Sequence, residues 1–325
     1  MNILITGGTG FFGKALLRVM RCKTETHPAH VTVLSRNPEK FLTQNPEFAR
    51  LPWLDFIEGD ILQAETLPYK EHFMYIIHAA ADSTLGPQLS PLERYDQIVS
   101  GTRNILDYAV KTGIKRVLYT SSGGIYGKLP ADIYQVNETY TGMPDPLNPE
   151  NAYGVAKREA EHLCTLYADA YGLDYVIARC FAFVGQDLPI HVHFAIGNFI
   201  RDALFKDSIQ VNGDGSPMRS YMAQQDLAEW LLALLQKGQT KNAYNVGSDE
   251  MVSIRNLAYL VRDIVAPEKE VHILGGPNDN SRDYYIPDIA KAKQQLGLKV
   301  SVSLKDAILQ TAQTLKACHE TAHYF

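Results

Sequence analysis

The feature that most constrains this chain is a glycine-rich turn between a buried strand and a helix at its N-terminus. Asn2–Thr6 is a short apolar run typical of a buried strand, and it leads into Gly7, Gly10 and Gly13 at GxxGxxG spacing. A backbone without side chains can approach a pyrophosphate, and the start of the following helix offers N–H donors and positive potential. The third glycine permits close packing of the helix on the strand. The pattern predicts a dinucleotide-binding loop, with an ordinary glycine turn as the alternative.

Strand-like runs and amphipathic helical stretches alternate through the first half of the chain. After the first strand, these runs are His30–Ser35, Trp53–Ile57, Phe73–His78, Lys115–Ser121 and Asp174–Arg179. Two long helical patterns, over about 91–112 and 151–171, lie between the later runs. Strands that alternate with helices predict a parallel sheet covered on both faces. We therefore expect an α/β protein with a Rossmann-type, doubly wound parallel sheet.

The pattern changes after about residue 181, where loops containing Gly, Pro and Asn predominate. Helices are expected at about 225–237, 253–265 and 304–318, and short strands near 209–211 and 244–246. We expect residues 1–180 to form an NAD(P)-binding domain. Residues 181–325 are expected to form a smaller substrate-binding lobe that is partly interleaved with the first.

Composition excludes several classes of function. The chain of 325 residues has 31 basic and 36 acidic side chains, a net charge of −5, which provides no cationic surface for nucleic acid. Cys22, Cys164, Cys180 and Cys318 are scattered and form no CxxC pair, which favours a reducing compartment. No leader pattern precedes the first strand, and no run reaches the ~18 apolar residues of a membrane span. We expect a cytoplasmic protein without a membrane partner.

The end of the second strand bears on which dinucleotide is bound. Ser35 and Arg36 stand where an NAD-specific fold usually has an acidic residue for the ribose 2′-hydroxyl. Arginine suits a 2′-phosphate, so NADP is expected, with NAD as the alternative if Arg36 is only a solvated side chain. Asp60, after the third strand, is expected to contact adenine, although an aspartate that caps its own loop would look the same.

A serine, a tyrosine and a lysine form a candidate catalytic set. Tyr153 and Lys157 are four residues apart on a predicted helix, so they project from one face. A phenol has a reference pKa of ~10, and a nearby ammonium is expected to lower it. Ser122 follows a predicted strand, at the edge where open α/β sheets place ligands. Its hydroxyl could bond the substrate oxygen that Tyr153 protonates.

With these motifs the chain resembles the extended short-chain dehydrogenase/reductase superfamily, and within it the NAD(P)-dependent nucleotide-sugar epimerase/dehydratase family. The matching segments are TGGTGFFG at 6–13, GD at 59–60, HAAA at 78–81, GTRNIL at 101–106, SSGGIYG at 121–127, YGVAK at 153–157, GDGSPMRSYM at 213–222, AYNVGS at 243–248 and PDIAKAKQQLG at 287–297. The resemblance implies that Ser122, Tyr153 and Lys157 are catalytic and that Lys157 also contacts the nicotinamide ribose. The cofactor contacts expected from the motifs and the resemblance are Gly7, Gly10, Phe11, Phe12, Gly13, Ser35, Arg36, Asp60, Ile61, Ala79, Ala80, Ala81, Tyr153 and Lys157.

The resemblance also implies a nucleotide-diphosphate sugar as substrate, contacted by Ser122. Arg219 matches an arginine that grips the diphosphate, and Asn198 matches an amide that contacts the same group. An arginine that only braces its own loop is the alternative for Arg219. The helices near 91–112 and 151–171 match those that form a homodimer interface in many relatives.

Three departures from the family pattern narrow the chemistry. Gly123 and Gly124 stand where sugar-nucleotide 4,6-dehydratases have an adjacent Asp-Glu pair, so the chain is not expected to eliminate water. Ala182 replaces an asparagine usual after the sixth strand. Many members of the family have an arginine just before the Pro-Asp motif, and Tyr284 stands at that position here. Arg282, two residues upstream, is expected to contact the substrate instead.

Two histidine patterns suggest other chemistry. His319 and His323 complete an HExxH pattern, which on a helix can bind zinc. Almost no chain follows to supply a third ligand, so a solvated terminal helix without a metal is expected. A substrate hydrogen bond from His193, next to His191, competes with a surface or packed histidine.

Three functions are compatible with these motifs. The leading interpretation is an enzyme that reduces a 4-keto nucleotide sugar with NADPH, Tyr153 protonating the developing alkoxide and Ser122 orienting it. The runner-up is a nucleotide-sugar 4-epimerase with tightly bound NAD, which uses the same groups in both directions. Arg36 favours the reductase. A non-catalytic nucleotide sensor is the third, but it has no physical need for the intact Ser/Tyr/Lys set.

Overall fold

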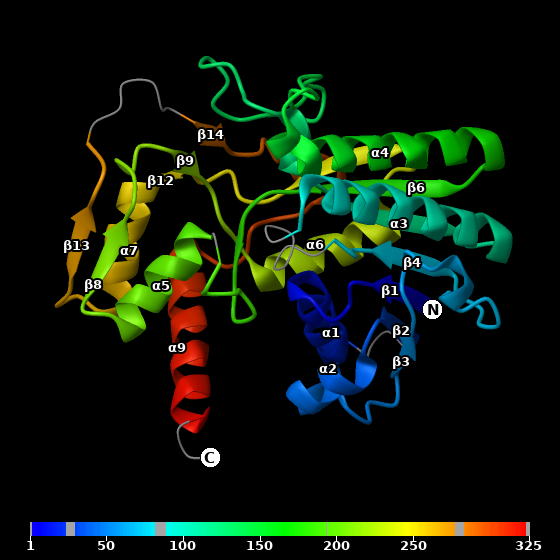
Figure 1. Cartoon of the computed structure of the whole chain (residues 1–325), viewed down its shortest axis with the longest axis horizontal. Helices are drawn as coiled ribbons and strands as arrows, with labels where there is room; N and C mark the ends of the chain where they lie inside the picture. Colours follow the sequence, from blue (N-terminus) through cyan, green and yellow to red (C-terminus); the bar gives the residue numbers. More distant parts are fainter. Residues whose placement is uncertain (1, 24–29, 82–88, 193, 277–282, 323–325) are drawn as a thin grey trace.

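A seven-stranded parallel sheet forms the centre of the larger lobe (Figure 1). The computed structural model describes residues 2–23, 30–81, 89–192, 194–276 and 283–322. The strands lie in the order β11-β6-β5-β4-β1-β2-β3, and every neighbouring pair is parallel. Their bounds are β1 Asn2–Thr6, β2 His30–Ser35, β3 Leu54–Glu58, β4 Tyr75–His78, β5 Arg116–Ser122, β6 Asp174–Cys180 and β11 Asn242–Val246. The predicted Rossmann-type fold is confirmed, and its switch point lies between β1 and β4.

Alternate side chains of each strand face two different helical layers. In β1, Ile3 and Ile5 pack in a core cluster with α1 and α6, whereas Leu4 packs in the cluster with α3 and α4. These three side chains are fully buried. Because successive strand residues point to opposite faces, an unbroken apolar strand needs cover on both sides. The covering helices are α1 Phe11–Lys23, α6 Gln224–Lys237, α3 Pro91–Thr112 and α4 Ala152–Tyr171.

Local sequence determines where the two long helices α3 and α4 begin and end. Ser90 and Glu93 form a reciprocal capping box at the start of α3. Both helices end at a glycine in the left-handed conformation, Gly113 with φ 71° and Gly172 with φ 69°. The two helices lie side by side over the large sheet (Figure 1), so that α4, which carries Tyr153 and Lys157, lies against β5, which ends at Ser122.

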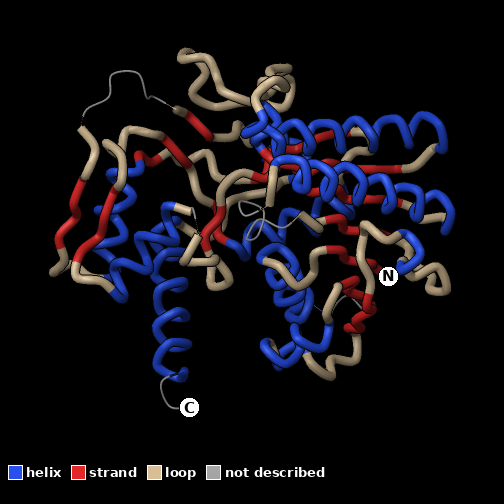
Figure 2. Tube along the Cα trace, in the orientation of Figure 1, coloured by secondary structure: helices blue, strands red, loops and turns tan. Residues whose placement is uncertain are grey.

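The smaller lobe is built mainly from residues after 181 and surrounds its own apolar cluster. Figure 2 shows that it combines helices with short strands. Its helices are α5 Ala195–Phe205, α7 Ile254–Val265 and α9 Leu304–Ala322, and α8 Ala290–Leu296 lies against β11. Three short-stranded sheets accompany them: β8 Ser208–Val211 with β13 Glu270–Ile273; β7 Phe183–Val184 with β10 Met222–Ala223; and β12 Val252–Ser253, β9 Met218–Arg219 and β14 Tyr284–Tyr285. The remaining elements are α2 Pro38–Gln44 and the 3₁₀ turns η1 Pro46–Phe48, η2 Ala64–Thr66, η4 Gly123–Tyr126 and η5 Pro149–Asn151.

The two lobes share structure rather than meeting at one linker. Strand β11 and helix α6 follow residue 181 in sequence but belong to the large sheet and its cover. Within the described ranges, no helix is both long and apolar enough to cross a membrane.

A buried carboxylate also joins the lobes. The Asp187 side chain is 7% exposed and accepts from Lys14 at 2.9 Å and from Arg18, both on α1. Gln224 at the start of α6 donates to the same carboxylate at 2.8 Å and to the Phe11 carbonyl at 2.7 Å. The beginning of α1 is thereby tied to the loop after β7 and to α6.

Candidate active site

The glycine turn after β1 has the shape that a bound pyrophosphate requires. Gly7 adopts φ +75°, and a Cβ there would stand 2.4 Å from the Ala79 carbonyl oxygen. A Cβ at Gly13 would stand 2.2 Å from Gly8, so neither position can carry a side chain. A Cβ at Gly10 would lie 3.5 Å from the Gly7 carbonyl oxygen, an ordinary contact, so this position is less crowded than the other two. The turn therefore fits a dinucleotide phosphate against the helix N-terminus.

The other expected cofactor residues lie along the carboxyl edge of the sheet. Ser35 is the last residue of β2, and Arg36, which follows it, is exposed; residues 79–81 follow β4 and are half-buried. Asp60 caps its own loop, because its Oδ1 accepts from the Leu62 N–H at 3.0 Å. The contact with adenine stays a prediction beside that capping role.

Ile61, also expected to contact the cofactor, is buried in the core beneath α3. A Cβ built on Gly101 would lie 2.5 Å from the Cδ1 atom of Ile61, so the side chain of Ile61 packs directly on α3. The Ile61 carbonyl oxygen accepts from the Asn104 amide at 2.8 Å. Any contact from Ile61 to a ligand would have to come from its backbone.

Ser122, Tyr153 and Lys157 come together where β5 ends and α4 begins. The Ser122 hydroxyl accepts from the Gly124 N–H at 3.0 Å, and a Cβ at Gly124 would lie 3.4 Å from this hydroxyl and 3.8 Å from the Tyr153 ring. The buried Lys157 ammonium donates to the Thr120 carbonyl at 2.7 Å and lies 6.0 Å from the centre of the Tyr153 ring. The structure thus places the three predicted residues in one cluster.

Burial dominates the titration of this cluster. It raises the pKa of Tyr153, against the Ser122 hydrogen bond and the Arg94 charge, which lower it; the Cys180 thiol raises it further. Burial lowers the pKa of Lys157 to about 8. The sequence argument expected the ammonium to lower the pKa of Tyr153. Instead the net shift is upward, and the opposing charge comes from Arg94 on α3.

The two glycines after Ser122 differ in the room they offer. A Cβ at Gly123 would stand 2.7 Å from the Phe181 ring and 2.8 Å from the Tyr285 hydroxyl. A Cβ at Gly124 would lie 3.4 Å from the Ser122 hydroxyl, an ordinary contact. A side chain at position 123 would therefore have to displace Phe181 or Tyr285, whereas position 124 borders the Ser122 hydroxyl and the Tyr153 ring at ordinary contact distances.

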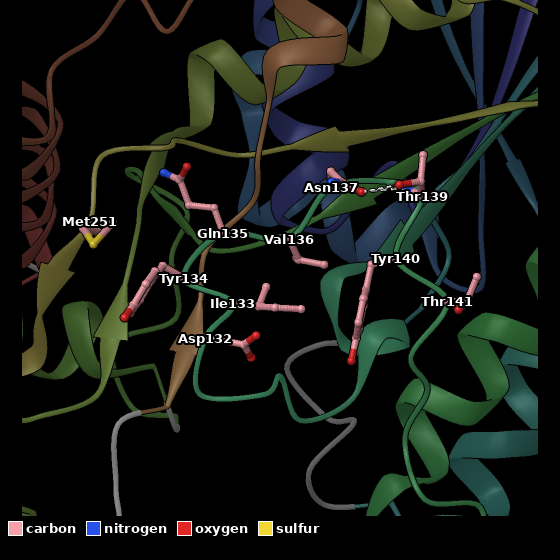
Figure 3. Close-up of a pocket in the computed structure, with 10 residues that line it drawn as sticks. All are labelled: Asp132, Ile133, Tyr134, Gln135, Val136, Asn137, Thr139, Tyr140, Thr141 and Met251. Atoms are coloured by element: carbon pink, nitrogen blue, oxygen red, sulfur yellow. Dashed lines mark hydrogen bonds between the residues drawn. The ribbon is translucent and has the colours of Figure 1, made fainter.

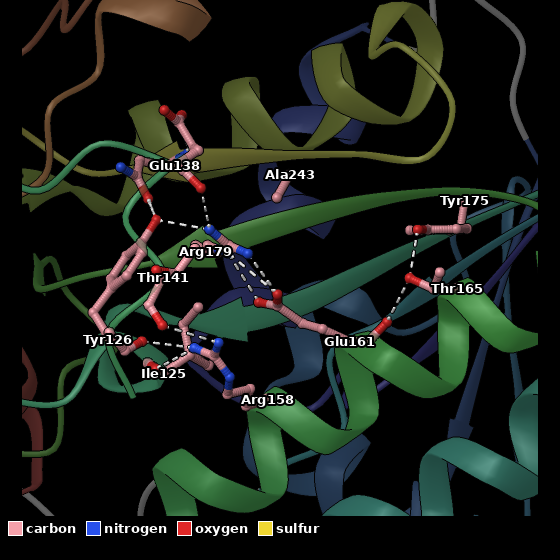
Figure 4. Close-up of polar contacts among 12 residues, drawn as sticks. Ile125, Tyr126, Glu138, Thr141, Arg158, Glu161, Thr165, Tyr175, Arg179 and Ala243 are labelled. Atoms are coloured by element: carbon pink, nitrogen blue, oxygen red, sulfur yellow. Dashed lines mark hydrogen bonds and ion pairs between the residues drawn. The ribbon is translucent and has the colours of Figure 1, made fainter. Parts of the chain in front are cut away.

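A buried polar network holds this turn in place (Figure 4). Arg179 on β6 binds Glu161 of α4 with hydrogen bonds of 2.8 to 3.2 Å and donates to the Tyr126 hydroxyl at 2.9 Å. Tyr126 in turn donates to Asn245 of β11 at 2.8 Å. Arg158 donates to the Ile125 carbonyl at 3.2 Å. Charges from β6 and α4 thus fix the backbone that follows Ser122.

Arg219 lies close to the cluster but is engaged by its own loop. Its guanidinium donates to the carbonyls of Met218 and Asp283 at 2.8 and 2.9 Å and to the Asp283 carboxylate at 2.7 Å. The parallel pairing of β9 with β14 sets Arg219 opposite Tyr285. In this structure Arg219 therefore braces its own loop, which is the role that the sequence left as the alternative to binding a diphosphate.

The remaining expected substrate residues are less closely connected to the cluster. Asn198 on α5 is half-buried, and its amide oxygen accepts from Arg201 at 2.9 Å. Arg282 and His193 lie outside the described residues, and His191 is exposed.

The tyrosine that reaches the catalytic cluster is Tyr285, not Tyr284. The Tyr285 hydroxyl lies 3.5 Å from the Ser122 hydroxyl. The Tyr284 ring packs edge-on against Tyr134, 5.1 Å between centres. Neighbouring residues of a strand point to opposite sides, so only one of the pair can face the site. The sequence contained the pair but not the register that selects Tyr285.

Other features stand apart from this cluster. A surface cavity of about 660 Å³ is lined by the loop 132–141 and Met251, and none of its lining residues is a predicted site residue (Figure 3). His319 lies on α9, but its side chain and His323 are outside the described part. Among the described side chains, no group of three or more His, Cys, Asp or Glu could hold a metal ion.

Comparison with known proteins identifies the family. Residues 3–247 match the NAD dependent epimerase/dehydratase family. This chain belongs to that family. The predicted relationship is confirmed, and the chain is an NAD-dependent enzyme of this family.

Curated relatives align along nearly the whole chain. UDP-glucuronic acid decarboxylase 6 of Arabidopsis thaliana is 30% identical over 313 residues, which cover 95% of this chain and 87% of the relative. UDP-glucuronic acid decarboxylase 1 of Danio rerio is 28% identical over 318 residues, covering 96% and 72%.

Solved structures confirm the fold. The UDP-glucose 4-epimerase of Thermotoga maritima has a TM-score of 0.83 at 24% identity, covering 98% of this chain and 100% of the other. The dTDP-glucose 4,6-dehydratase of Bacillus anthracis, solved with NAD, has a TM-score of 0.84 at 21% identity, covering 98% of each chain.

Proposed function

We propose that this enzyme reduces the 4-keto group of a nucleotide-diphosphate sugar with NADPH. The observation that carries the proposal is the meeting of Ser122 and Tyr153 beside Gly123 and Gly124. This arrangement can transfer one proton to an oxygen at the reacting carbon. Neither glycine supplies the carboxylate that elimination of water requires, so redox chemistry without dehydration is favoured.

The protein's own groups would act on the proton and the oxygen, while bound NADPH would supply the hydride. Tyr153 retains its proton at neutral pH, because burial raises its pKa. As charge develops on the 4-oxygen, the phenol gives up this proton and Ser122 holds the oxygen by a hydrogen bond. The Arg94 charge, which lowers the pKa of Tyr153, would favour the phenolate that remains, and the Lys157 ammonium, 6.0 Å from the tyrosine ring centre, would be a second cation on the same side of the site.

The second candidate is a nucleotide-sugar 4-epimerase with retained NAD. It is favoured by the NAD dependence of the family. The reverse of the same proton transfer, with Tyr153 present as the phenolate, would remove a proton from a 4-hydroxyl, which an epimerase requires before it reduces the other face. The named relatives act on UDP-glucuronic acid. A C4 ketone would promote loss of a neighbouring carboxylate without a further acid or base, so UDP-glucuronate belongs in any substrate panel.

The deciding experiment identifies the dinucleotide and then the reaction. Purified enzyme is denatured, the released dinucleotide is identified by mass spectrometry, and turnover is followed with 4-keto sugar nucleotides, UDP-glucose and UDP-glucuronate. Oxidation of added NADPH with a 4-keto substrate supports the reductase. Retained NAD with interconversion of 4-epimers supports the epimerase and overturns the reductase.

Tyr153→Phe tests the assigned proton donor in the same assay. The variant is expected to bind the dinucleotide normally and to lose turnover by at least ~100-fold, because general acid catalysis contributes about 10²–10⁴-fold. Near-normal turnover in a correctly folded variant would remove Tyr153 from the mechanism.

We further propose that Arg219 turns from its loop to the diphosphate of the substrate. A diphosphate offers oxygens matched to the guanidinium fork, and the competing Asp283 side chain is 51% exposed. Arg219→Ala should weaken binding of UDP, dTDP, CDP or GDP in isothermal titration while NADP affinity stays unchanged. If the wild type binds none of the four at millimolar concentration, the nucleotide-sugar proposal fails.

We propose that the outer faces of α3 and α4 form a homodimer interface. Leu92 on α3 is 70% exposed, and Leu166 and Tyr171 on α4 are 48% and 63% exposed. Exposed apolar side chains on adjacent helices are a surface that a second copy could cover. Sedimentation should give twice the mass of 36.3 kDa, and a monomer at micromolar concentration would contradict this arrangement.

A further inference from the structure

A buried glutamine connects the start of α1 with the loop after β7. Gln224 is the first residue of α6, and its side-chain amide donates to the Phe11 carbonyl at 2.7 Å and to the Asp187 carboxylate at 2.8 Å. The oxygen of the same amide accepts from the Asp187 backbone N–H at 3.3 Å. Both amide protons and the amide oxygen therefore have partners inside the protein.

The partners of this amide determine its orientation. If its nitrogen and oxygen were exchanged, the oxygen would face the Phe11 carbonyl and the Asp187 carboxylate, which are both acceptors. The loop after β7 also leaves room for this side chain, because a Cβ at Gly185 would lie 2.4 Å from the Cβ and 2.5 Å from the amide oxygen of Gln224. Gln224 thus directs a donor at the first residue of α1.

The Phe11 carbonyl belongs to the same peptide unit as the N–H of Phe12. Helix α1 begins at Phe11, so the Phe12 N–H is one of the donors that the first turn of a helix leaves without an acceptor in the helix. A trans peptide unit is planar, and its N–H points opposite to its C=O. A hydrogen bond that fixes the Phe11 carbonyl therefore also fixes the direction of the Phe12 N–H, and it polarises this N–H as a donor.

The side chains of Phe11 and Phe12 pack inside the protein. The Phe12 ring lies edge-on against the Phe183 ring, with 5.4 Å between their centres, and the Phe11 ring lies 6.5 Å from the same ring. Both rings also pack against the core cluster that contains α1 and α6. We therefore expect the contact of Phe11 and Phe12 with the cofactor to come from their backbone, which Gln224 holds.

We propose that Gln224 is a positioning residue for the dinucleotide: it holds the Phe11–Phe12 peptide so that the N–H of Phe12 donates to the pyrophosphate. The inference rests on the dinucleotide dependence of the family and on the glycine turn as the phosphate site, and it applies to a reductase and an epimerase alike. Asp187 has a structural role, because it anchors α1 and accepts the second proton of the amide. A side chain 213 positions along the chain from Phe11 would thereby set the affinity for the cofactor.

Gln224→Met tests this role, because methionine has nearly the same length and removes both donors. Gln225→Met is the matched control, since Gln225 is the next residue of α6 and is exposed. Dinucleotide retained on purification is quantified, and NAD and NADP are then titrated by fluorescence. Isothermal titration with UDP, dTDP, CDP and GDP, the melting temperature, and kcat with the substrate identified for the wild type are measured for each variant.

Gln224→Met is expected to weaken binding of the dinucleotide by about threefold to tenfold, the contribution of one neutral hydrogen bond. At saturating dinucleotide, kcat should stay unchanged, because the bond is made equally before and during the reaction. Affinity for the nucleotide diphosphate should also stay unchanged, and Gln225→Met should match the wild type throughout. Unchanged dinucleotide affinity, or equal weakening of dinucleotide and nucleotide diphosphate, would overturn the inference.

Asp187→Asn separates this role from a general loss of stability. Asparagine keeps an acceptor for Gln224, so this variant should melt at a lower temperature but bind the dinucleotide within about twofold of the wild type. If Asp187→Asn weakens dinucleotide binding as much as Gln224→Met does, the effect follows from lost stability, and the inference is refuted while the proposed function stands. If the wild type binds neither NAD nor NADP, the inference and the cofactor of the proposed function fail together.

Discussion

Asp187→Asn should destabilise the fold because one buried carboxylate balances two cations of α1. The substitution keeps the shape of the side chain but removes the charge that Lys14 and Arg18 face. A charge-assisted hydrogen bond contributes about 1.5–3 kcal/mol. Lys14 and Arg18 keep 20% and 31% of their side-chain surface exposed, so water can replace part of the lost interaction. The expected loss in free energy of unfolding is about 2 kcal/mol at pH 7.

Urea denaturation followed by circular dichroism measures this loss, and Glu47→Gln is the matched control. Glu47 contacts the same Arg18 at 3.6 Å, but its side chain is 41% exposed. Exposed pairs contribute little, so the control should change stability by less than about 0.5 kcal/mol. If the two variants unfold at the same urea concentration, the buried carboxylate has no special role and the reasoning is refuted.

The pH dependence of the Asp187 effect has a definite sign. Burial raises the pKa of Asp187, but the hydrogen bonds and charges of Arg18 and Lys14 outweigh it, and the net pKa lies below the usual range. A carboxyl with a depressed pKa stabilises the fold above its unfolded pKa of ~3.9 and loses that contribution as the pH falls through the folded pKa. The difference between wild type and Asp187→Asn should therefore shrink below about pH 4. If the difference in unfolding free energy does not change with pH, the effect of Asp187→Asn does not come from the charge of this carboxylate.

Three further predictions follow from the geometry. Arg36→Ala should reduce affinity for NADP relative to NAD by about tenfold to a hundredfold; equal losses in fluorescence titrations would show that Arg36 does not read a 2′-phosphate. Gly123→Ala should cost about 1–3 kcal/mol of stability through overpacking, whereas Gly124→Ala should melt as the wild type does; similar melting temperatures would contradict the packing argument. Glu161→Gln, which leaves Arg179 buried without its anion, should cost about 3 kcal/mol in thermal unfolding, and a negligible change would show that the network does not stabilise the turn after Ser122.

The sequence predicted helices and strands accurately where the hydrophobic periodicity is strong. The long helix predicted over 91–112 is α3, with the same bounds, and most predicted strands of the large sheet lie within a residue or two of those observed. These segments alternate or repeat over enough residues to reveal which faces are buried. The glycine turn could also be predicted from the sequence, because Gly7 and Gly13 stand where the backbone packs too closely on Ala79 and Gly8 for a side chain.

The sequence was less informative where two-residue strands build the site. Strands β9, β12 and β14 are too short to show a period, and β9 pairs with β12 across more than thirty positions and with β14 across more than sixty. Tyr284 and Tyr285 are chemically the same, so only the register of β14 decides which hydroxyl approaches Ser122. The upward shift in the pKa of Tyr153 also depended on burial, which the spacing of Tyr153 and Lys157 does not reveal.

The return of β11 to the large sheet has a consequence for how the protein is made. On a ribosome, the first 180 residues would present β6 as an open edge until β11 emerges more than sixty residues later. The apolar face that α6 covers would be exposed until Gln224–Lys237 has emerged, shortly before β11. A fragment ending at residue 180 should therefore aggregate or require a chaperone. The nascent protein can complete its core only after much of the smaller lobe has already been synthesised.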